Sequence, residues 1–308
     1  MTKVLIATEK PFAPVAVNGI REICQKEGFE LVLLEKYTQK SELLAAVADV
    51  DAMIVRSDKI DNEVFDAAKN LKIVVRAGAG TDAIDLKSAS AHNVVVMNTP
   101  GQNANAVAEM VMSLFVYAVR NFFNGKPGTE LMGKRLGLMA YGNTAKNVAR
   151  IAKGFGMEVC AYDSYCPDEV MLQDGVQPIK TPQELFKTCS FVALHLPATP
   201  ETIKSINYEL VNNMPKGGVL LNAARQEIID EAGLLKLLQE RTDLKYLTDC
   251  KPEPEIQAEM EKLEGRFFAS PKKLGAQTAE ANINAGLAAA RQIASFIKEG
   301  VTKFQVNK

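Results

Sequence analysis

Short runs of β-branched and aliphatic residues alternate with longer amphipathic stretches along the whole chain. The first series of these runs lies at residues 4–7, 30–34, 51–55, 72–75 and 94–97. A second series follows, with the runs RLGLMA, EVCAYD, FVALHLP, GVLLNAA, KYLTDC and RFFAS. Such a rhythm is typical of βαβ units, in which helices connect parallel strands. The sequence therefore predicts an α/β fold with two doubly wound parallel sheets.

The Gly- and Pro-containing segment 124–133 separates the two series and indicates a boundary between two domains. The length of 308 residues agrees with two domains of roughly 150 residues each. We predict one long helix over residues 104–123, which would connect the first sheet to the second. A last helix is predicted over residues 279–299, and Gly300 would end it.

Composition and cysteine spacing exclude several classes of protein. The chain has 36 Lys and Arg against 37 Asp and Glu, so it lacks the cationic surplus that a nucleic-acid partner requires. Five cysteines without a C-x-x-C pair argue against a disulfide framework and a zinc site, and they fit a reducing cytoplasm. The longest apolar run, residues 110–119, is shorter than the ~20 residues that cross a bilayer. We expect no metal, no nucleic acid and no membrane as partners.

The turn after the run RLGLMA has the context of a dinucleotide-binding turn, because it lies between a predicted strand and the helical stretch KNVARIAKGFG. Of the three glycines that are usual there, only the middle one, Gly142, is present. Ala145 is a tolerated substitute at the third position, whereas Ala140 at the first requires the bend to use a negative φ. The predicted cofactor-binding residues of this turn are Tyr141, Gly142, Asn143, Thr144 and Ala145.

Asp163 makes the interpretation as a dinucleotide-binding turn more specific. It ends the next predicted strand, 21 residues after Gly142, where an acid accepts hydrogen bonds from an adenosine ribose. Ser164 and Tyr165 follow it and supply no cation for a 2′-phosphate, so NAD is favoured over NADP. An ordinary strand, turn and helix with an exposed Asp is the alternative interpretation.

The chain has only two histidines, so an imidazole catalyst would have to be one of them. His92 lies in a polar turn and is most simply a solvated surface residue. His195 stands at the carboxyl end of a predicted strand, where open α/β sheets bind ligands. We expect His195 to line the cofactor site rather than to act as a base.

Six segments carry a family resemblance: IVRSDKID at 54–61, VVRAGAGTDAIDL at 74–86, MNTPGQNANAVAE at 97–109, HLPATPET at 195–202, NAARQEIIDE at 222–231 and KLGAQTAEA at 273–281. Through them the chain resembles the D-isomer-specific 2-hydroxyacid dehydrogenase family along nearly its whole length. Within that family it is most similar to the short phosphoglycerate dehydrogenases, which lack the C-terminal regulatory domain of longer members.

The resemblance implies a particular domain organisation. Residues 1–99 plus 283–308 would form a flavodoxin-like substrate-binding domain, and residues 100–282 would form an inserted Rossmann NAD-binding domain. It also implies a homodimer, for which the apolar helix at 104–123 is the candidate interface.

The resemblance further assigns roles in the NAD-binding domain. Arg225 would bind the substrate carboxylate and polarise the C2 oxygen, which suits a planar guanidinium of permanent charge. Glu253 would be the family's acid partner of the catalytic base, and Gln226 stands where the family has a glycine. Asp249 would lie near the nicotinamide. The remaining residues matched to the family's cofactor site are His195, Pro197, Thr202, Ala223, Gly275 and Ala276.

The catalytic histidine of the family is replaced in this chain. Matching KLGAQT to the family motif places Lys273 in the position of the base and leaves Lys272 as an additional residue. A lysine there must be neutral to accept the hydroxyl proton, and both desolvation and a neighbouring cation such as Arg225 favour the neutral form. We therefore expect that Glu253 does not contact Lys273 and that alcohol oxidation is fastest at alkaline pH.

In the substrate-binding domain, the resemblance implies a phosphate site at Arg56 and Ser57, with Arg76 as a further cation. Backbone amides of Ala77 and Gly78 would hold the carboxylate, and Asn103 would be a polar lining residue. Because the net charge is −1, attraction of a multiply charged substrate has to be local. An exposed arginine at the end of a strand is the alternative interpretation of Arg56, and also of Arg225.

Together these features predict NAD-dependent oxidation of 3-phospho-D-glycerate to 3-phosphohydroxypyruvate, the first step of serine biosynthesis. The partner would be a small phosphorylated 2-hydroxy acid. Two alternatives stay open. One is an NAD(H)-dependent reductase of another 2-oxo acid such as glyoxylate, and the other is a catalytically idle NAD-binding regulator.

Overall fold

The computed structural model describes residues 1–307, and the chain divides into two compact units. Unit 1 contains Met1–Asn103 and the segment from Thr278 onward, and unit 2 is Ala104–Gln277. The breaks differ by a few residues from the predicted boundaries at 99 and 282, because both coincide with the start of a helix. α5 (Ala104–Val119) begins unit 2, and the side chain of Thr278 caps α12 (Ala279–Glu299).

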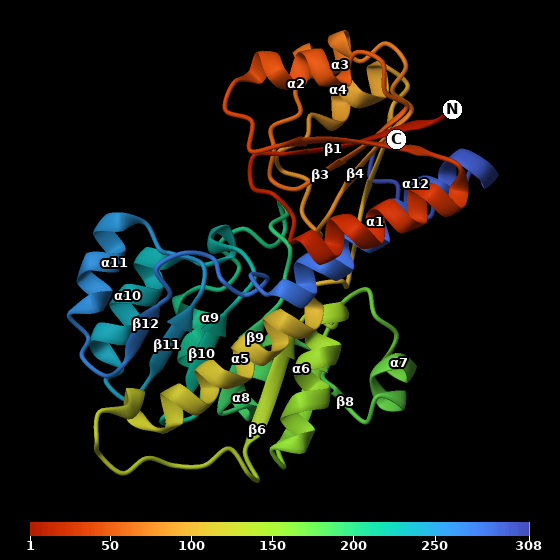
Figure 1. Ribbon diagram of the computed structural model, residues 1–308. Helices are drawn as coiled ribbons and strands as arrows, with labels where there is room; N and C mark the ends of the chain where they lie inside the picture. Colours follow the sequence, from red (N-terminus) through yellow and green to blue (C-terminus); the bar gives the residue numbers. More distant parts are fainter. Residues whose placement is uncertain (308) are drawn as a thin grey trace. The chain divides into compact units, whose positions relative to one another are not determined.

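Unit 1 is built on a five-stranded sheet in which all neighbouring strands are parallel (Figure 1). In spatial order the strands are β2 (Glu30–Glu35), β1 (Lys3–Thr8), β3 (Ala52–Val55), β4 (Ile73–Arg76) and β5 (Val95–Asn98). The order 2-1-3-4-5 is that of a flavodoxin-like, doubly wound sheet. The central strands β1 and β3 are buried along almost their whole length, as expected for a parallel sheet that is covered on both faces.

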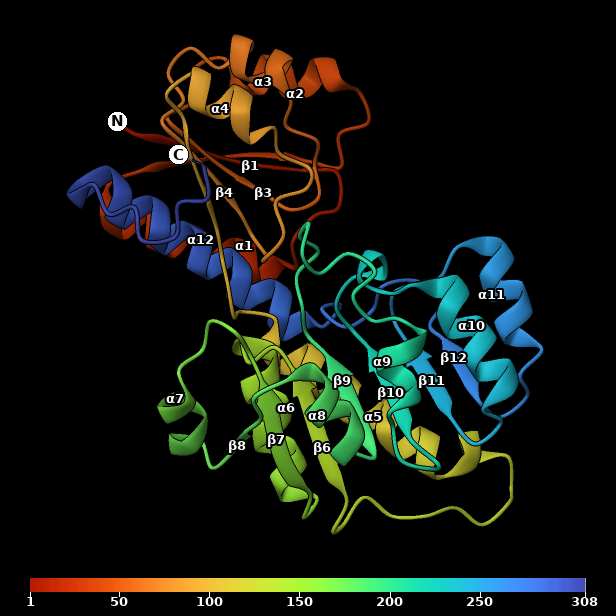
Figure 2. The same cartoon turned by 180° about the vertical axis from the view of Figure 1, so that it is seen from behind.

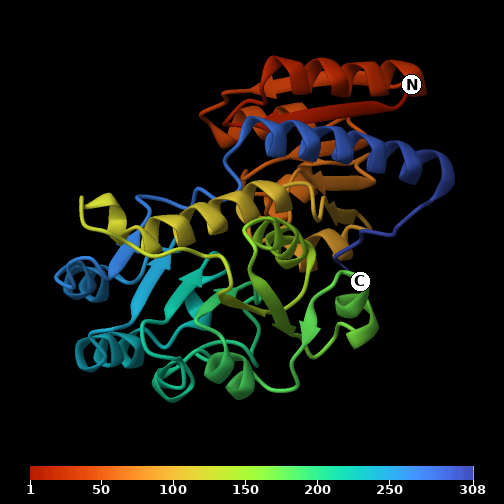
Figure 3. The same cartoon turned by 90° about the horizontal axis from the view of Figure 1, so that it is seen from below.

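Helices cover both faces of this sheet. On one face lie α2 (Lys40–Val47), α3 (Asn62–Ala67) and α4 (Leu86–Ala91). On the other face α1 (Pro14–Glu27) packs against α12, and Figure 3 shows the two helices side by side. α12 ends as predicted at Gly300, which has a φ of 68°. Since α1 comes early in the chain and α12 late, unit 1 is assembled from two separate stretches of sequence.

Unit 2 contains a seven-stranded parallel sheet (Figure 2). In spatial order its strands are β12 (Phe267–Ala269), β11 (Lys245–Thr248), β10 (Val219–Asn222), β9 (Phe191–Leu194), β6 (Arg135–Met139), β7 (Glu158–Tyr162) and β8 (Gln177–Pro178). The helices besides α5 are α6 (Asn143–Gly154), α7 (Asp168–Gln173), α8 (Pro182–Thr188), α9 (Tyr208–Asn212), α10 (Glu231–Glu240) and α11 (Pro254–Glu261). α5 and α6 cover one face, and α8, α9 and α10 cover the other. The predicted fold class, two doubly wound parallel α/β domains, is confirmed.

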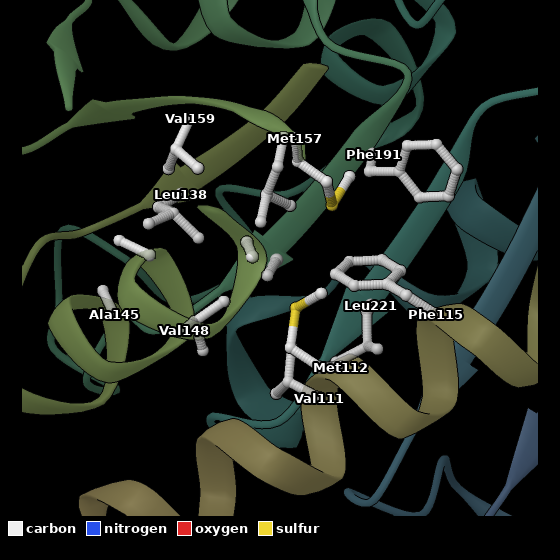
Figure 4. Packing of buried hydrophobic residues seen from close by; sticks show 14 of the residues in the cluster. Val111, Met112, Phe115, Leu138, Ala145, Val148, Met157, Val159, Phe191 and Leu221 are labelled. Carbon is white, nitrogen blue, oxygen red and sulfur yellow. The ribbon is translucent and has the colours of Figure 1, made fainter. Parts of the chain in front are cut away.

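Figure 4 shows the core between the sheet of unit 2 and the helices α5 and α6. The ring of Phe115 on α5 meets the ring of Phe191 on β9 edge-on, with centroids 5.3 Å apart. Val148 of α6 and Leu138 of β6 belong to the same buried cluster. Truncation of a fully buried Phe to Ala costs about 3–5 kcal/mol, so this packing fixes α5 firmly to the sheet.

α5 is shorter than the sequence predicts. It ends at Val119 rather than at residue 123, and Asn121–Phe123 form a separate 3-10 turn in which φ is positive. Lys245 of β11 explains the early end. Its Nζ donates to the Ala118 carbonyl at 2.7 Å and to Asn121 Oδ1 at 3.0 Å, which satisfies a terminal carbonyl of the helix.

Candidate active site

The turn between β6 and α6 has the shape of a phosphate-binding turn. A Cβ placed on Gly142 would meet no atom within 4 Å, so a ligand phosphate has room to approach the backbone. α6 begins at Asn143, and no side chain caps it. The amides of a first helical turn without a side-chain cap are available to an anion. The residues of this turn therefore fit a dinucleotide.

The backbone conformation of Ala140 shows that one prediction is wrong. Its φ is +73°, whereas the sequence analysis requires a negative φ for an alanine at this position. The amide of Ala140 donates to the Tyr162 carbonyl at 2.9 Å, so the ladder between β6 and β7 continues through it. The bend that follows needs a left-handed residue, and alanine takes that conformation at a cost of about 1–2 kcal/mol.

Asp163 is held in place by the backbone around it. Its Oδ2 accepts a hydrogen bond from the Tyr141 amide at 2.7 Å. Its Oδ1 accepts bonds from the amides of Tyr165 and Cys166 at 2.7 and 3.0 Å. A carboxylate offers about four lone pairs, so a free position remains on Oδ2 for a ribose hydroxyl. The Tyr141 side chain is buried instead, and its hydroxyl donates to Asp174 Oδ2.

His195 follows β9, and its amide donates to the Met139 carbonyl at 2.9 Å. Among residues 1–307 its Nε2 has no hydrogen-bond partner, and burial lowers the pKa of His195 to about 4. A neutral ring with so low a pKa is a poor proton acceptor near neutral pH. In the loop that follows, Thr202 Oγ1 donates to the Pro197 carbonyl at 2.5 Å, which closes this segment on itself.

Two cationic side chains meet at one backbone oxygen after β10. Arg225 Nη1 donates to the Ala224 carbonyl at 2.9 Å, and Lys273 Nζ donates to the same carbonyl at 2.6 Å. Buried Asn222 fixes this turn, because its Nδ2 donates to the Arg225 carbonyl and its Oδ1 accepts from the Ala224 amide. The structure thus brings Arg225 and Lys273 together, although they are far apart in sequence. Lys272 and Lys273 are both exposed, so the predicted desolvation of Lys273 is wrong for this structure. The carbonyl of Lys272 accepts a bond from Ser270 Oγ.

Buried Asp249 positions the segment that carries Lys273. Its Oδ2 accepts a bond from the Gly275 amide at 3.0 Å, and its Oδ1 accepts a weaker one from the Cys250 thiol at 3.4 Å. Cys250 also interacts with Lys273, while burial raises the pKa of its thiol to about 12. Sequence analysis missed Cys250. Its place directly after Asp249, at the end of a strand, was the available signal. Ala223 and Ala276 lie half-buried in the two segments that meet here.

Glu253 bonds to the loop of Arg225 and not to a base. Its Oε1 accepts a hydrogen bond from Gln226 Nε2 at 3.1 Å, and its amide donates to Glu231 Oε2 at 3.0 Å. Burial raises the pKa of Glu231. These three side chains line a cavity of about 590 Å³. Glu231 is a second residue that sequence analysis missed, although it lies in one of the family-like segments.

In unit 1, Arg56 and Arg76 lie together at the carboxyl ends of β3 and β4. Arg56 Nη1 donates to the carbonyls of Lys10 and Pro11 at 2.9 and 3.0 Å, and its Nη2 donates to Asn282 Oδ1 at 2.7 Å. Arg76 Nε donates to the Arg56 carbonyl at 2.9 Å. Burial lowers the pKa of the Arg56 guanidinium. Three neutral acceptors therefore orient a half-buried cation.

The two backbone amides predicted to hold the substrate carboxylate are already bonded within the protein. The Ala77 amide donates to the Val55 carbonyl at 2.8 Å, because the ladder between β3 and β4 extends one residue beyond the strand. The Gly78 amide donates to the Arg76 carbonyl at 2.8 Å. The predicted role of these two amides in holding a carboxylate stays a prediction. Of the other predicted residues in unit 1, Ser57 is exposed and Asn103 is half-buried.

Within residues 1–307, no group of three or more His, Cys, Asp and Glu side chains is arranged to hold a metal ion. No helix in the same residues is both long enough and apolar enough to pass through a membrane.

Known proteins are similar to this chain in both sequence and structure. Residues 116–268 match the family described as D-isomer specific 2-hydroxyacid dehydrogenase, NAD binding domain. A D-3-phosphoglycerate dehydrogenase of Methanocaldococcus jannaschii is 34% identical over 283 residues, which are 87% of this chain and 54% of that protein. A hydroxypyruvate reductase of Thermotoga maritima is 34% identical over 292 residues, 89% of this chain and 93% of that protein.

Among solved structures, an NAD⁺-bound 3-phosphoglycerate dehydrogenase of Entamoeba histolytica is similar with a TM-score of 0.88 and 46% sequence identity. The match covers 100% of this chain and 99% of that one. The chain belongs to the D-isomer-specific 2-hydroxyacid dehydrogenase family. It carries that family's NAD-binding domain, and NAD is its cofactor. The chain spans about half the length of the curated phosphoglycerate dehydrogenases of M. jannaschii and Arabidopsis thaliana that it matches.

Proposed function

We propose that the protein oxidises 3-phospho-D-glycerate to 3-phosphohydroxypyruvate with NAD. The observation that supports the proposal is that Arg225 and Lys273 both donate a hydrogen bond to the Ala224 carbonyl. A group suited to bind a carboxylate therefore lies beside an amine that is suited to accept a proton. The names of several relatives support the same substrate.

Each of the two residues has a distinct task. Arg225 uses one of its five N–H donors on Ala224, so a fork remains to bind the substrate carboxylate and orient C2. Lys273 accepts the proton of the C2 hydroxyl. Bound NAD supplies the acceptor for the hydride that leaves C2. The positive charge of Arg225 also draws electron density toward the developing carbonyl oxygen.

Lys273 has to be neutral to accept the hydroxyl proton in this step. The carboxylate of Glu253 is bonded to Gln226 and not to Lys273. Because an amine gives up its proton only at high pH, we expect oxidation to be fastest at alkaline pH. A profile of log(kcat/KM) that stays flat above about pH 7.5 would argue against this role.

Arg56 would bind the substrate phosphate. Its guanidinium is oriented by three neutral acceptors, so its charge is not cancelled by a bonded carboxylate. Such a preoriented cation is suited to a phosphate oxygen.

Two lysine variants test the proposed base. We expect Lys273→Ala to lower kcat/KM for phosphoglycerate oxidation by about 10²- to 10⁴-fold, because a positioned general base contributes that much. The neighbouring Lys272→Ala serves as the matched control and should leave the rate nearly unchanged. NADH titration checks that both variants still bind the cofactor. A Lys273→Ala enzyme that keeps its rate contradicts the proposed base.

A second candidate function is the reduction of an unphosphorylated 2-oxo acid. It is favoured by the similarity to the T. maritima hydroxypyruvate reductase, 93% of whose length is matched. Initial rates with phosphohydroxypyruvate, hydroxypyruvate and glyoxylate distinguish the two functions. Binding of NADH without turnover of any 2-oxo acid would favour an idle regulator instead.

We also propose that the protein is a homodimer, with a second copy seated near the end of α5. Two large apolar side chains are exposed in the segment between α5 and β6, namely Phe123 at 67% and Met132 at 71%. Exposed large apolar side chains are candidate contacts of a subunit interface. Light scattering coupled to size-exclusion chromatography measures the mass, and a Phe123→Asp, Met132→Asp double variant should shift it toward that of one chain.

A further inference from the structure

Two cysteines in unit 2 face each other inside the protein. Cys160 lies on β7, and Cys189 caps the carboxyl end of α8. Their Sγ atoms are 3.1 Å apart, and both residues are fully buried at 0% exposure. Both belong to the buried cluster between the sheet and α8. No step proposed for the enzyme uses either thiol.

A glycine in the neighbouring strand makes room for this pair. Gly137 stands beside Cys160 in the parallel register of β6 and β7, so the two residues direct their Cβ positions to the same face of the sheet. A Cβ on Gly137 would lie 3.0 Å from Cys189 Sγ and 2.9 Å from Leu185 Cγ. The Cys189 side chain therefore occupies the space that a side chain at position 137 would take. Glycine in a strand interior often marks such a close approach.

The surroundings of the pair also distinguish the two sulfurs. The hydrogen bond with Cys160, helped by Thr188 and by the charge of Arg135, lowers the pKa of Cys189 against the opposing effect of burial. The same contact together with burial raises the pKa of Cys160. Since the thiolate is the nucleophile, Cys189 is the sulfur that reacts first with an oxidant small enough to enter the core.

We propose that Cys160 and Cys189 are a modification site, at which a peroxide converts the two thiols into an internal disulfide. In the first step the Cys189 thiolate attacks a peroxide oxygen, the O–O bond breaks, and sulfenic acid and water form after proton uptake. In the second step Cys160 sulfur attacks the sulfenic sulfur, the S–S bond forms, and the hydroxyl leaves as water. Two thiols lose two electrons and two protons, and one peroxide is reduced to two waters.

The disulfide would link β7 to the end of α8 and close a loop that contains α7, β8 and α8. Closing a loop of this length restricts the unfolded chain, so the oxidised protein should be more stable than the reduced one. A dithiol reductant would reverse the change, because thiol–disulfide exchange restores both thiols. This inference does not depend on the substrate proposed above.

The test uses the full chain with Cys166→Ser, which removes the only half-buried thiol among the five cysteines. The protein is treated with hydrogen peroxide, unfolded, alkylated with iodoacetamide and measured by mass spectrometry. We expect a loss of about 2 Da before alkylation and two fewer alkylated cysteines than in the untreated sample. A peptide that joins Cys160 to Cys189 identifies the bond, and the melting temperature should rise by about 5–10 °C.

Three further variants in the same background control the experiment. Cys160→Ala and Cys189→Ala should each abolish the 2 Da loss. Cys24→Ala removes a buried cysteine of unit 1 that is not part of the pair, and it should leave the loss intact. The proposal is overturned if peroxide leaves both thiols available for alkylation, or if the linked peptides contain any other pair. Circular dichroism of each variant before treatment confirms that it is folded.

Discussion

Two arginines of this protein stand at the ends of parallel strands, but their guanidinium groups make different numbers of hydrogen bonds within the protein. The guanidinium of Arg56 in unit 1 donates to three acceptors, on Lys10, Pro11 and Asn282. The guanidinium of Arg225 in unit 2 donates to the Ala224 carbonyl, and Asn222 bonds the turn that carries it.

The difference indicates what each residue is able to do. A guanidinium that is held by three acceptors is preoriented, and it gains little freedom to follow a substrate. A guanidinium with fewer such bonds keeps more donors free and adjusts to the group it binds. Under the proposed function, Arg56 would make a fixed contact with a phosphate, whereas Arg225 would bind the carboxylate beside the reacting carbon.

The largest effect is expected for Arg225. Arg225→Gln removes the charge and the fork that we propose for carboxylate binding, and we expect kcat/KM to fall by about 10²- to 10³-fold. Exposed Arg291 of unit 1 supplies the control variant Arg291→Gln, which should retain full activity. Steady-state kinetics at 340 nm give both values. Equal losses of kcat/KM in Arg225→Gln and Arg291→Gln would contradict a specific role of Arg225.

Arg56→Gln should have a more selective effect. A hydrogen bond to a charged group contributes about 1.5–3 kcal/mol, so we expect KM for the phosphorylated substrate to rise about 10- to 100-fold. KM for unphosphorylated hydroxypyruvate should stay nearly constant, because that substrate has no phosphate to lose. A comparable rise for both substrates would mean that Arg56 supports unit 1 without contacting phosphate.

Substitutions of Asn222 and Asn282 test how strongly the site of each arginine is fixed. Asn222→Ala removes a fully buried side chain that makes two backbone bonds, and it should lower the free energy of unfolding by about 1–3 kcal/mol, together with kcat. Asn282→Ala leaves Arg56 with its two carbonyl acceptors, so its cost should be closer to about 1 kcal/mol. Urea unfolding measures both costs. The reverse order would show that the tip of Arg56 is the more strongly fixed site.

The smallest effect is the response of unit 1 to pH. The Ser88 carbonyl and Asp66 raise the pKa of His92 above 6.5, so the charged ring stabilises the folded protein below that pH. This contribution is lost as the pH rises through the higher folded value. His92→Gln should therefore lower the melting temperature at about pH 5.5 and match the original protein at about pH 8.5. Scanning calorimetry at both pH values checks this, and a constant difference would contradict it.

The alternation of apolar and amphipathic runs predicts the fold because local periodicity determines which faces are buried. The end of α5 was not predictable from its own residues, since it depends on Lys245 of a distant strand. The sign of φ at Ala140 likewise depends on the ladder with β7.

Sequence motifs identified Arg225 and Lys273 as candidates, but only the folded chain shows that they share the Ala224 carbonyl. The same motifs could not show that the Ala77 and Gly78 amides are already bonded, because hydrogen-bond partners of a loop are a tertiary property. Cys250 was missed for a similar reason, since its neighbour Lys273 lies in a different segment.

The position of α12 has a consequence for the newly made polypeptide. On the ribosome, every strand and helix of unit 2 is synthesised before α12, which covers one face of the β1–β3–β4 layer. All helices and strands of unit 2 are thus synthesised before those of unit 1 are complete. The apolar face of unit 1 stays uncovered until α12 has been synthesised. Exposed nascent strands are prone to association, so translation that pauses before α12 would leave a chain in need of a chaperone.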